Sequence, residues 1–193
     1  MKKRLKKCFL AAVCAALLIT SAAPAVYADG NLSFRAYSAE IADTKADSEG
    51  YRADAAEARL GEDAEMIEAS DEKAVLLRAD GSVTFEFPSV KEGIYTVTLV
   101  YSAEQGSYGN LKYELSVNGE IPFEECRSLK LDRRYRYDKP EKDFAGNEIT
   151  PQPVEIYEKL SSQVCDPAGK RLEPFIFKLG SGCSVTVKNQ NAD

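Results

Sequence analysis

The residues best suited to contact a ligand lie in one polar segment, residues 132–153. A tyrosine ring can stack on an apolar face of a ligand, while guanidinium, carboxylate and amide groups can hold its hydroxyl groups. Prolines and a glycine interrupt the segment, so we expect an irregular loop, which at this length is either functional or poorly ordered. The candidate ligand-binding residues are Arg133, Arg134, Tyr135, Tyr137, Asp143 and Asn147, with Arg136 among them. In the alternative interpretation the loop is structural and its arginines neutralise an acidic surface.

Catalytic chemistry has little support in the sequence. The chain has no histidine, which removes Ser–His, Cys–His and His–metal sites together. Glu124 and Glu125 are adjacent carboxylates, but on a strand they would point to opposite faces and could not flank one bond. The same two acids precede Cys126, where they would raise the pKa of the thiol. We therefore rank binding above catalysis and predict that the chain is not an enzyme.

The first residues have the features of a secretory leader. A cluster of lysines and an arginine at residues 2–7 precedes an apolar run at residues 8–19, which is short for a membrane span. The small-residue sequence at 26–28 fits a cleavage site, so we predict a signal peptide at residues 1–28. The mature chain is then secreted or held at the extracellular surface, with no membrane span.

The net negative charge of the chain limits the classes of molecule that it can bind. The 193-residue chain has 25 basic and 31 acidic residues, and the leader removes five basic residues and no acidic ones. A mature chain this acidic lacks the basic face that phosphate binding requires, which excludes a nucleic-acid-binding function. It also makes an anionic membrane surface an unfavourable partner.

Alternating apolar residues predict the elements that must hold the candidate loop. Residues 82–87, 94–101, 111–117, 174–179 and 183–187 each alternate with period two, which is typical of strands. Asn118-Gly119 predicts a tight hairpin turn after the third of these. Helical spacing of Phe34, Tyr37 and Ile41 predicts a short N-terminal helix, capped by Asn31 or Ser33. We expect an all-β fold, an antiparallel β-sandwich, at residues 51–193, preceded by a helix and linker at residues 29–50.

A β-sandwich implies a set of core residues, but the sequence leaves open the inward face of one strand and the pairing of the cysteines. Packing of two sheets would bury Val83, Phe85, Phe87, Tyr95, Val97, Leu99, Leu115, Val117, Phe175, Phe177, Val185 and Val187. Both faces of residues 94–101 carry apolar side chains, so the sequence does not settle which one points inward. The mature chain keeps Cys126, Cys165 and Cys183, which form either one disulfide with a free thiol or three small buried side chains.

Several of these segments together resemble a known family. The sequences at 81–85, 93–95, 117–119, 179–180 and 185–187 resemble carbohydrate-binding modules of the galactose-binding-like jelly-roll type. The segments at 118–123, 143–147, 151–155, 166–169 and 174–177 are closer to the N-terminal β-sandwich of extracellular solute-binding proteins of bacterial carbohydrate ABC transporters. The chain departs from that family where Tyr135 or Tyr137 replaces a tryptophan and Cys183 replaces an asparagine.

The resemblance implies a non-catalytic module that binds an oligo- or polysaccharide and serves an ABC transporter. It also implies a structural calcium ion, for which Glu57, Asp143 and Asp166 are the candidate oxygen ligands. Solvated acidic side chains are the alternative explanation of these three residues. The alternative function is a structural or protein-interaction β-sandwich, or a truncated fragment of a solute-binding protein without a working sugar site.

Overall fold

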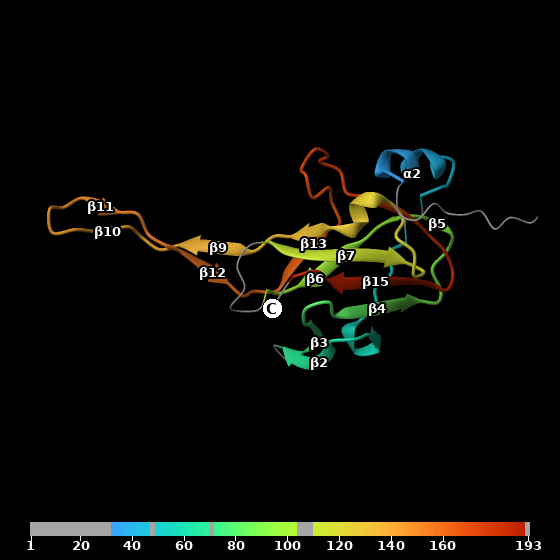
Figure 1. Cartoon of the computed structure of the whole chain (residues 1–193), viewed down its shortest axis with the longest axis horizontal. Helices are drawn as coiled ribbons and strands as arrows, with labels where there is room; N and C mark the ends of the chain where they lie inside the picture. Colours follow the sequence, from blue (N-terminus) through green and yellow to red (C-terminus); the bar gives the residue numbers. More distant parts are fainter. Residues whose placement is uncertain (1–31, 47–48, 70–71, 104–109, 192–193) are drawn as a thin grey trace, which may run out of the picture.

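A computed structural model describes residues 32–46, 49–69, 72–103 and 110–191 (Figure 1). The predicted signal peptide lies outside these ranges, so its assignment stays a prediction. The helical elements are α2 (Phe34–Glu40), η1 (Ala55–Glu57) and η2 (Glu124–Arg127). The strands are β1 (Arg59–Leu60), β2 (Ala64–Ala69), β3 (Glu72–Leu77), β4 (Ser82–Phe87), β5 (Gly93–Thr96), β6 (Thr98–Tyr101), β7 (Leu111–Val117), β8 (Leu129–Leu131), β9 (Arg134–Tyr137), β10 (Glu141–Lys142), β11 (Glu148–Ile149), β12 (Pro153–Ile156), β13 (Leu160–Gln163), β14 (Ile176–Leu179) and β15 (Cys183–Asn189).

The main layer is a five-stranded antiparallel sheet in the order β1-β4-β15-β7-β8. Its central strand, β15, pairs with β4 through Val185 opposite Phe85, and with β7 through Val185 opposite Val117. Alternating side chains put one face of each strand toward the second layer and the other toward solvent. The strands predicted at 82–87, 111–117 and 183–187 are therefore confirmed, as is the all-β class.

The second layer is built from the pairs β14–β5 and β13–β6. The Val97 carbonyl accepts a hydrogen bond from the Val164 amide at 2.9 Å, and the Val164 carbonyl accepts one from the Phe175 amide at 2.8 Å. These bonds bridge the two pairs at the point where the strand predicted at 94–101 divides into β5 and β6. Its inward face is also settled: Tyr95 and Leu99 pack against the core, whereas Val100 is 60% exposed.

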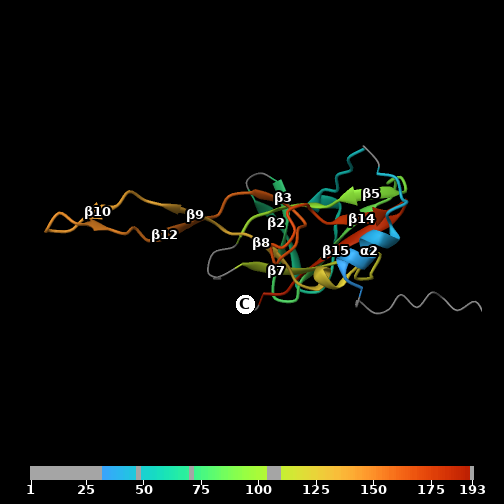
Figure 2. The ribbon, with the colours of Figure 1, turned by 90° about the horizontal axis from the view of Figure 1, so that it is seen from above.

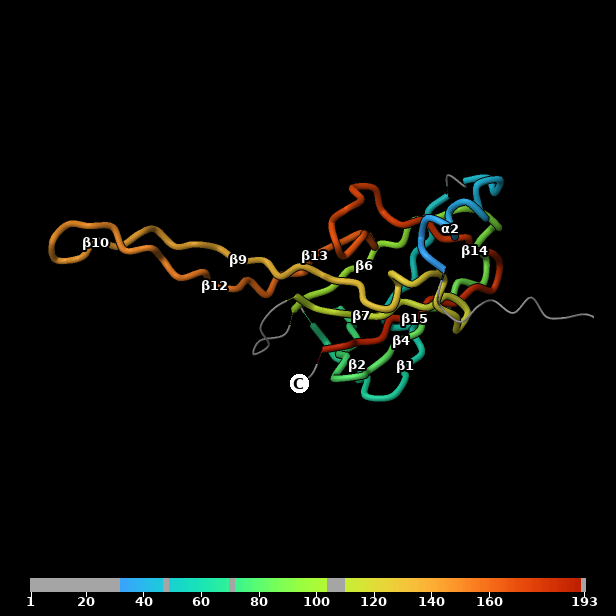
Figure 3. Tube along the Cα trace, turned by 45° about the horizontal axis from the view of Figure 1, so that its top comes forward, coloured from blue at the N-terminus to red at the C-terminus, as the bar shows by residue number. Residues whose placement is uncertain are grey.

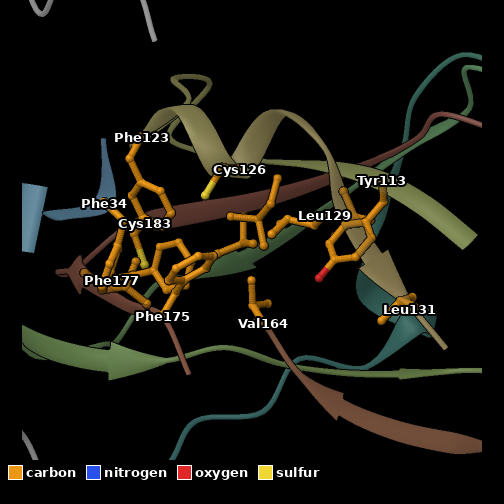
Figure 4. Close-up of a cluster of buried hydrophobic side chains, with 14 of the residues drawn as sticks. Phe34, Tyr113, Phe123, Cys126, Leu129, Leu131, Val164, Phe175, Phe177 and Cys183 are labelled. Carbon is orange, nitrogen blue, oxygen red and sulfur yellow. The ribbon is translucent and has the colours of Figure 1, made fainter. Parts of the chain in front are cut away.

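The core lies between the two layers (Figure 4). Six of the predicted core residues are buried: Val83, Leu115, Phe175, Phe177, Val185 and Val187. The other six pack against them while partly exposed: Phe85, Phe87, Tyr95, Val97, Leu99 and Val117. Sequence patterning did not identify Phe123, Leu129 and Val164, all of them fully buried, because each lies in or beside a short or irregular element.

The predicted hairpin turn and the predicted helix are both present. Asn118 and Gly119 adopt φ of 53° and 81°, the left-handed conformation that a tight hairpin turn needs. The Asn118 side chain also accepts a hydrogen bond from the Ser184 amide at 2.9 Å, which ties the turn to β15. Helix α2 begins after Ser33, whose hydroxyl accepts a hydrogen bond from the Ala36 amide, as expected of an N-cap.

The interpretation of residues 132–153 as an irregular loop is wrong. This region forms most of a long β-hairpin, which we call the arm (residues 134–156), with β9 pairing β12 and β10 pairing β11 further out. The arm projects from one end of the sandwich (Figures 1 and 2). The Arg-Tyr-Arg-Tyr sequence of β9 alternates two polar residue types rather than apolar with polar ones, so it lacked the usual signal of a strand.

Candidate functional site

The arm sorts the candidate residues onto two faces. Opposite residues of an antiparallel pair share a face, and β9 is in register with β12 as Tyr137 opposite Pro153 and Arg136 opposite Val154. One face, which we call the tyrosine face, therefore carries Tyr135, Tyr137, Pro153 and Glu155. The other, the arginine face, carries Arg134, Arg136, Val154 and Ile156.

The tyrosine face presents two aromatic rings to solvent. Tyr135 is 44% exposed and Tyr137 is 68% exposed. Two residues along a strand span about 6.8 Å, so the rings follow one another along the ribbon. An exposed aromatic pair of this kind offers apolar ring faces for stacking and two phenol groups for hydrogen bonding. Tyr135 and Tyr137 are the predicted residues whose placement best suits contact with a ligand.

Arg133 lies at the foot of the arm and has a different role. Its side chain is 1% exposed and forms an ion pair with Glu155, whose carboxylate also accepts a hydrogen bond from the Tyr157 hydroxyl at 3.1 Å. Next to it, the Tyr101 hydroxyl donates to the Asp132 carbonyl at 2.7 Å. In this conformation Arg133 does not reach a ligand at the surface, and its geometry is that of a residue that fixes the arm to the sandwich.

Asp143 and Asn147 form the turn at the tip of the arm. One carboxylate oxygen of Asp143 accepts hydrogen bonds from the Ala145 and Asn147 amides, each at 2.8 Å, and the other accepts from the Asn147 side chain at 3.0 Å. The Asn147 side-chain bond, followed by its backbone bond, lowers the pKa of Asp143 from its ordinary value. Gly146 completes the turn with φ of 86°. The predicted ligand set is thus divided among the foot, the two faces and the tip, with Arg134 on the arginine face.

The three calcium candidates do not form one cluster. Asp166 caps another turn, where it accepts hydrogen bonds from the backbone amides of Ala168, Lys170 and Arg171 at 2.9–3.2 Å. Glu57 lies in η1 and Asp143 at the tip of the arm. Within the described ranges, no group of three or more acidic, cysteine or histidine side chains is placed to hold a metal ion. Calcium binding stays an untested prediction.

A shallow hollow between η1 and β4 was not anticipated from the sequence. Its volume is about 260 Å³, and it is lined by Tyr51, Phe85 and Phe87 together with the ion pair of Arg52 and Asp54 at 2.9 Å. The only sequence signal was Tyr51, in a segment whose alanines and alternation left helix and strand both open. The hollow combines aromatic and charged side chains, but it is open to solvent.

The remaining reactive groups are structural. Cys126, Cys165 and Cys183 are all free thiols, and burial raises the pKa of each. Glu124 and Glu125 begin the short helix η2, and Glu125 accepts a hydrogen bond from the Phe34 amide at 2.9 Å. Glu125 thus anchors α2, and Cys126 and Cys183 belong to the buried core.

Comparisons with known proteins add one structural likeness. No family model matches the chain, and no curated protein matches its sequence. Among solved structures, it is similar to the native structure of a family 35 carbohydrate binding module from Clostridium thermocellum, with 12% sequence identity and a TM-score of 0.41 over 73% of this chain and 86% of that chain. The fold assignment therefore rests on the strand pairing described above. No helix in the described part of the chain is long and apolar enough to cross a membrane.

Proposed function

We propose that this chain is an exported, non-catalytic module that binds carbohydrate through the tyrosine face of the arm. The observation that carries the proposal is the pair Tyr135 and Tyr137, exposed on one face of a ribbon that stands clear of the sandwich. Pyranose rings have an apolar C–H face that stacks on aromatic rings, and their hydroxyl groups suit phenol partners. A protruding ribbon can lie along an extended polysaccharide.

Binding without catalysis is favoured by the chemistry available near the face. The chain has no histidine, and the carboxylate on the tyrosine face, Glu155, is held by Arg133 and Tyr157. A general acid needs a second carboxylate across the scissile bond, roughly 5–9.5 Å away. No carboxylate opposes Glu155 in the register of the described arm, where its partner is Tyr135.

The proposal extends to location and biological context. The basic start, apolar run and small-residue site at residues 1–28 support export. The resemblance to the N-terminal sandwich of solute-binding proteins supports a role in capturing sugar for an ABC transporter. Transporter components of that kind are then proposed partners, and a carbohydrate is the proposed ligand.

The second candidate function is a protein-interaction module. The observation in its favour is that the arm also exposes Phe144 at 105%, Ile149 at 50% and Val154 at 39%. Phe144 lies at the tip and Val154 on the arginine face, so these two side chains could contact a protein without the tyrosine face taking part. The two candidates therefore make different predictions for different residues of one arm.

The test is binding of the mature chain, residues 29–193, to a panel of polysaccharides, followed by calorimetric titration of the best ligand. Replacing both Tyr135 and Tyr137 by alanine should weaken affinity about ten- to a hundredfold, because each stacked ring contributes about 0.5–1.5 kcal/mol. The matched control is Phe144→Ala, which removes a still more exposed ring from the tip and should leave affinity unchanged. Absence of binding to every polysaccharide, or equal affinity of the double variant, would contradict the proposal.

A further inference from the structure

The two edges of the arm differ in their capacity to pair with another strand. Pro151 and Pro153 lie in and just before β12, and proline lacks the N–H group that a neighbouring strand would need. The β9 side has no proline from residue 133 to residue 139. Within the residues that the structure describes, β9 pairs with β12 alone. One edge of the ribbon is therefore protected and the other is open.

The open edge belongs to a ribbon that gains little from its own packing. Figure 3 shows the arm running clear of the sandwich, and an isolated two-stranded hairpin is only marginally stable in water. Joining a third and fourth strand would satisfy the outward backbone groups of β9. Two copies related by a two-fold axis can do this with the same strand, since an antiparallel pair is self-complementary.

The charges along β9 select one register for such a pair. When two identical strands pair in antiparallel fashion about a two-fold axis, a residue lies opposite a partner residue whose number differs from its own by zero, two or four. Odd differences do not occur, because the backbone groups of successive residues point to alternate edges of the strand. A pair centred on Tyr135 would place Arg134 opposite the partner's Arg136. A pair centred on Arg136 would place Arg136 opposite the partner's Arg136. Both registers bring two positive charges together at that position, which is unfavourable. Centring on Asp138 places two carboxylates together for the same reason.

The pair centred on Tyr137 is favourable at the two positions on either side of the axis, where Asp138 and Lys139 directly follow β9. It sets Arg136 opposite the partner's Asp138 and Tyr135 opposite the partner's Lys139, once on each side of the axis. Opposite charges and cation–aromatic pairs across strands are both stabilising. Within one chain Arg136 and Asp138 lie 3.9 Å apart and both side chains are about two-thirds exposed, so both remain accessible to a partner.

We propose that two copies of this chain associate by antiparallel pairing of β9 with β9 of the second copy, centred on Tyr137, to form a four-stranded sheet. Because opposite residues share a face, Tyr135 and Tyr137 of both copies then lie on one continuous surface. The pairing itself does not depend on the proposed sugar binding. The role of the doubled aromatic surface does depend on the proposed sugar binding. Such a surface fits a ligand longer than one arm could cover.

The experiment is sedimentation equilibrium of the mature chain, from micromolar concentration to about 1 mM, the range in which a modest interface dissociates. The native sequence should show a reversible monomer–dimer equilibrium. Arg136→Asp should raise the dimer dissociation constant about tenfold or more, because two cross-strand attractions become repulsions. The double variant with Arg136→Asp and Asp138→Arg should restore the native dissociation constant to within about threefold.

The matched control is Lys170→Glu, a charge reversal at an exposed turn of the sandwich outside the arm, which should leave the dimer unchanged. A chain that stays monomeric at every concentration overturns the proposal. So does a dimer that Arg136→Asp does not weaken, or one that the double charge swap fails to restore. Polysaccharide binding by a strictly monomeric chain would leave the proposed function intact while refuting the pairing, so the two failures are distinguishable.

Discussion

The sandwich and the arm use aromatic residues in opposite ways. In the sandwich, Phe123 is fully buried, with its ring centroid 5.0 Å from Phe175 and 5.6 Å from Phe177. In the arm, Tyr137 is 68% exposed and Phe144 is fully exposed. The same class of side chain stabilises the fold in one region and remains available for contact in the other. The difference shows that the presence of aromatic residues does not by itself identify a binding site. What matters is whether the ring lies between the two sheets or on the exposed arm.

The contrast has a simple physical origin. Two stacked sheets enclose side chains from both sides, so each ring removed from water contributes to stability. A two-stranded ribbon encloses nothing, and its side chains keep most of their contact with water. Changes in the sandwich should therefore alter stability, and changes in the arm should alter association.

The largest effect is expected from Phe123→Ala. The ring contacts Phe34, Tyr37, Phe175 and Phe177, so its removal leaves a cavity that four neighbours line. We expect the free energy of unfolding to fall by about 3–5 kcal/mol, measured by urea denaturation. A fall of less than about 1 kcal/mol would show that the aromatic cluster does not hold α2 to the sandwich.

The next effect is expected at the junction of the two regions. Glu155→Ala removes the carboxylate that pairs with the buried Arg133, and leaving a buried charge without it costs about 3 kcal/mol. Replacing both residues, with Arg133→Met and Glu155→Leu, should recover most of that loss. Urea denaturation of Arg133→Met, Glu155→Leu and the double variant gives the coupling energy. Purely additive losses would mean that the ion pair does not join the arm to the sandwich.

A smaller, local effect is expected at the tip when the pH falls. The pKa of Asp143 is depressed in the folded chain, so its contribution is present above the ordinary value of 3.8 and is lost as the pH falls through the folded value. The Ala145 and Asn147 amides, which donate to this carboxylate, should therefore lose protection from hydrogen exchange only at pH values below 3.8. In Asp143→Asn the exchange protection of these amides should not show that transition.

The smallest effect on stability is expected from Tyr137→Ala. This ring is 68% exposed, so its removal should change the free energy of unfolding by no more than about 0.5 kcal/mol in the monomer. The same urea experiment as for Phe123→Ala gives the comparison directly. A loss close to that of Phe123→Ala would erase the distinction between sandwich and arm.

Much of the sandwich could be predicted because its signals are local. Val83, Phe85 and Phe87 alternate in one short segment, and Asn118-Gly119 needs positive φ wherever it occurs. The inward face at residues 94–101 could not be predicted, since Tyr95 and Val100 differ in exposure only through what lies opposite them. Phe123 and Val164 were missed because contacts distant in sequence bury them.

The sequence indicated which residue types could contact a ligand, but not how the candidate residues are arranged in space. The sequence located Tyr135 and Tyr137 correctly as exposed polar-segment aromatics, yet it did not show that they share a face. It grouped Arg133 with them, although the pairing with Glu155 that buries Arg133 spans 22 residues. Such long-range ion pairs leave no periodic signal, so only the register of β9 with β12 reveals them.

The central position of β15 has a consequence for the order in which the protein can fold. This strand joins β4 to β7, yet it is the last strand of the sandwich to be synthesised. Until residue 189 has emerged from the ribosome, the two halves of the main sheet have no common neighbour, and their apolar faces cannot close. The main sheet can therefore close only once residue 189 is available, so the strands that precede β15 cannot complete the sandwich by themselves.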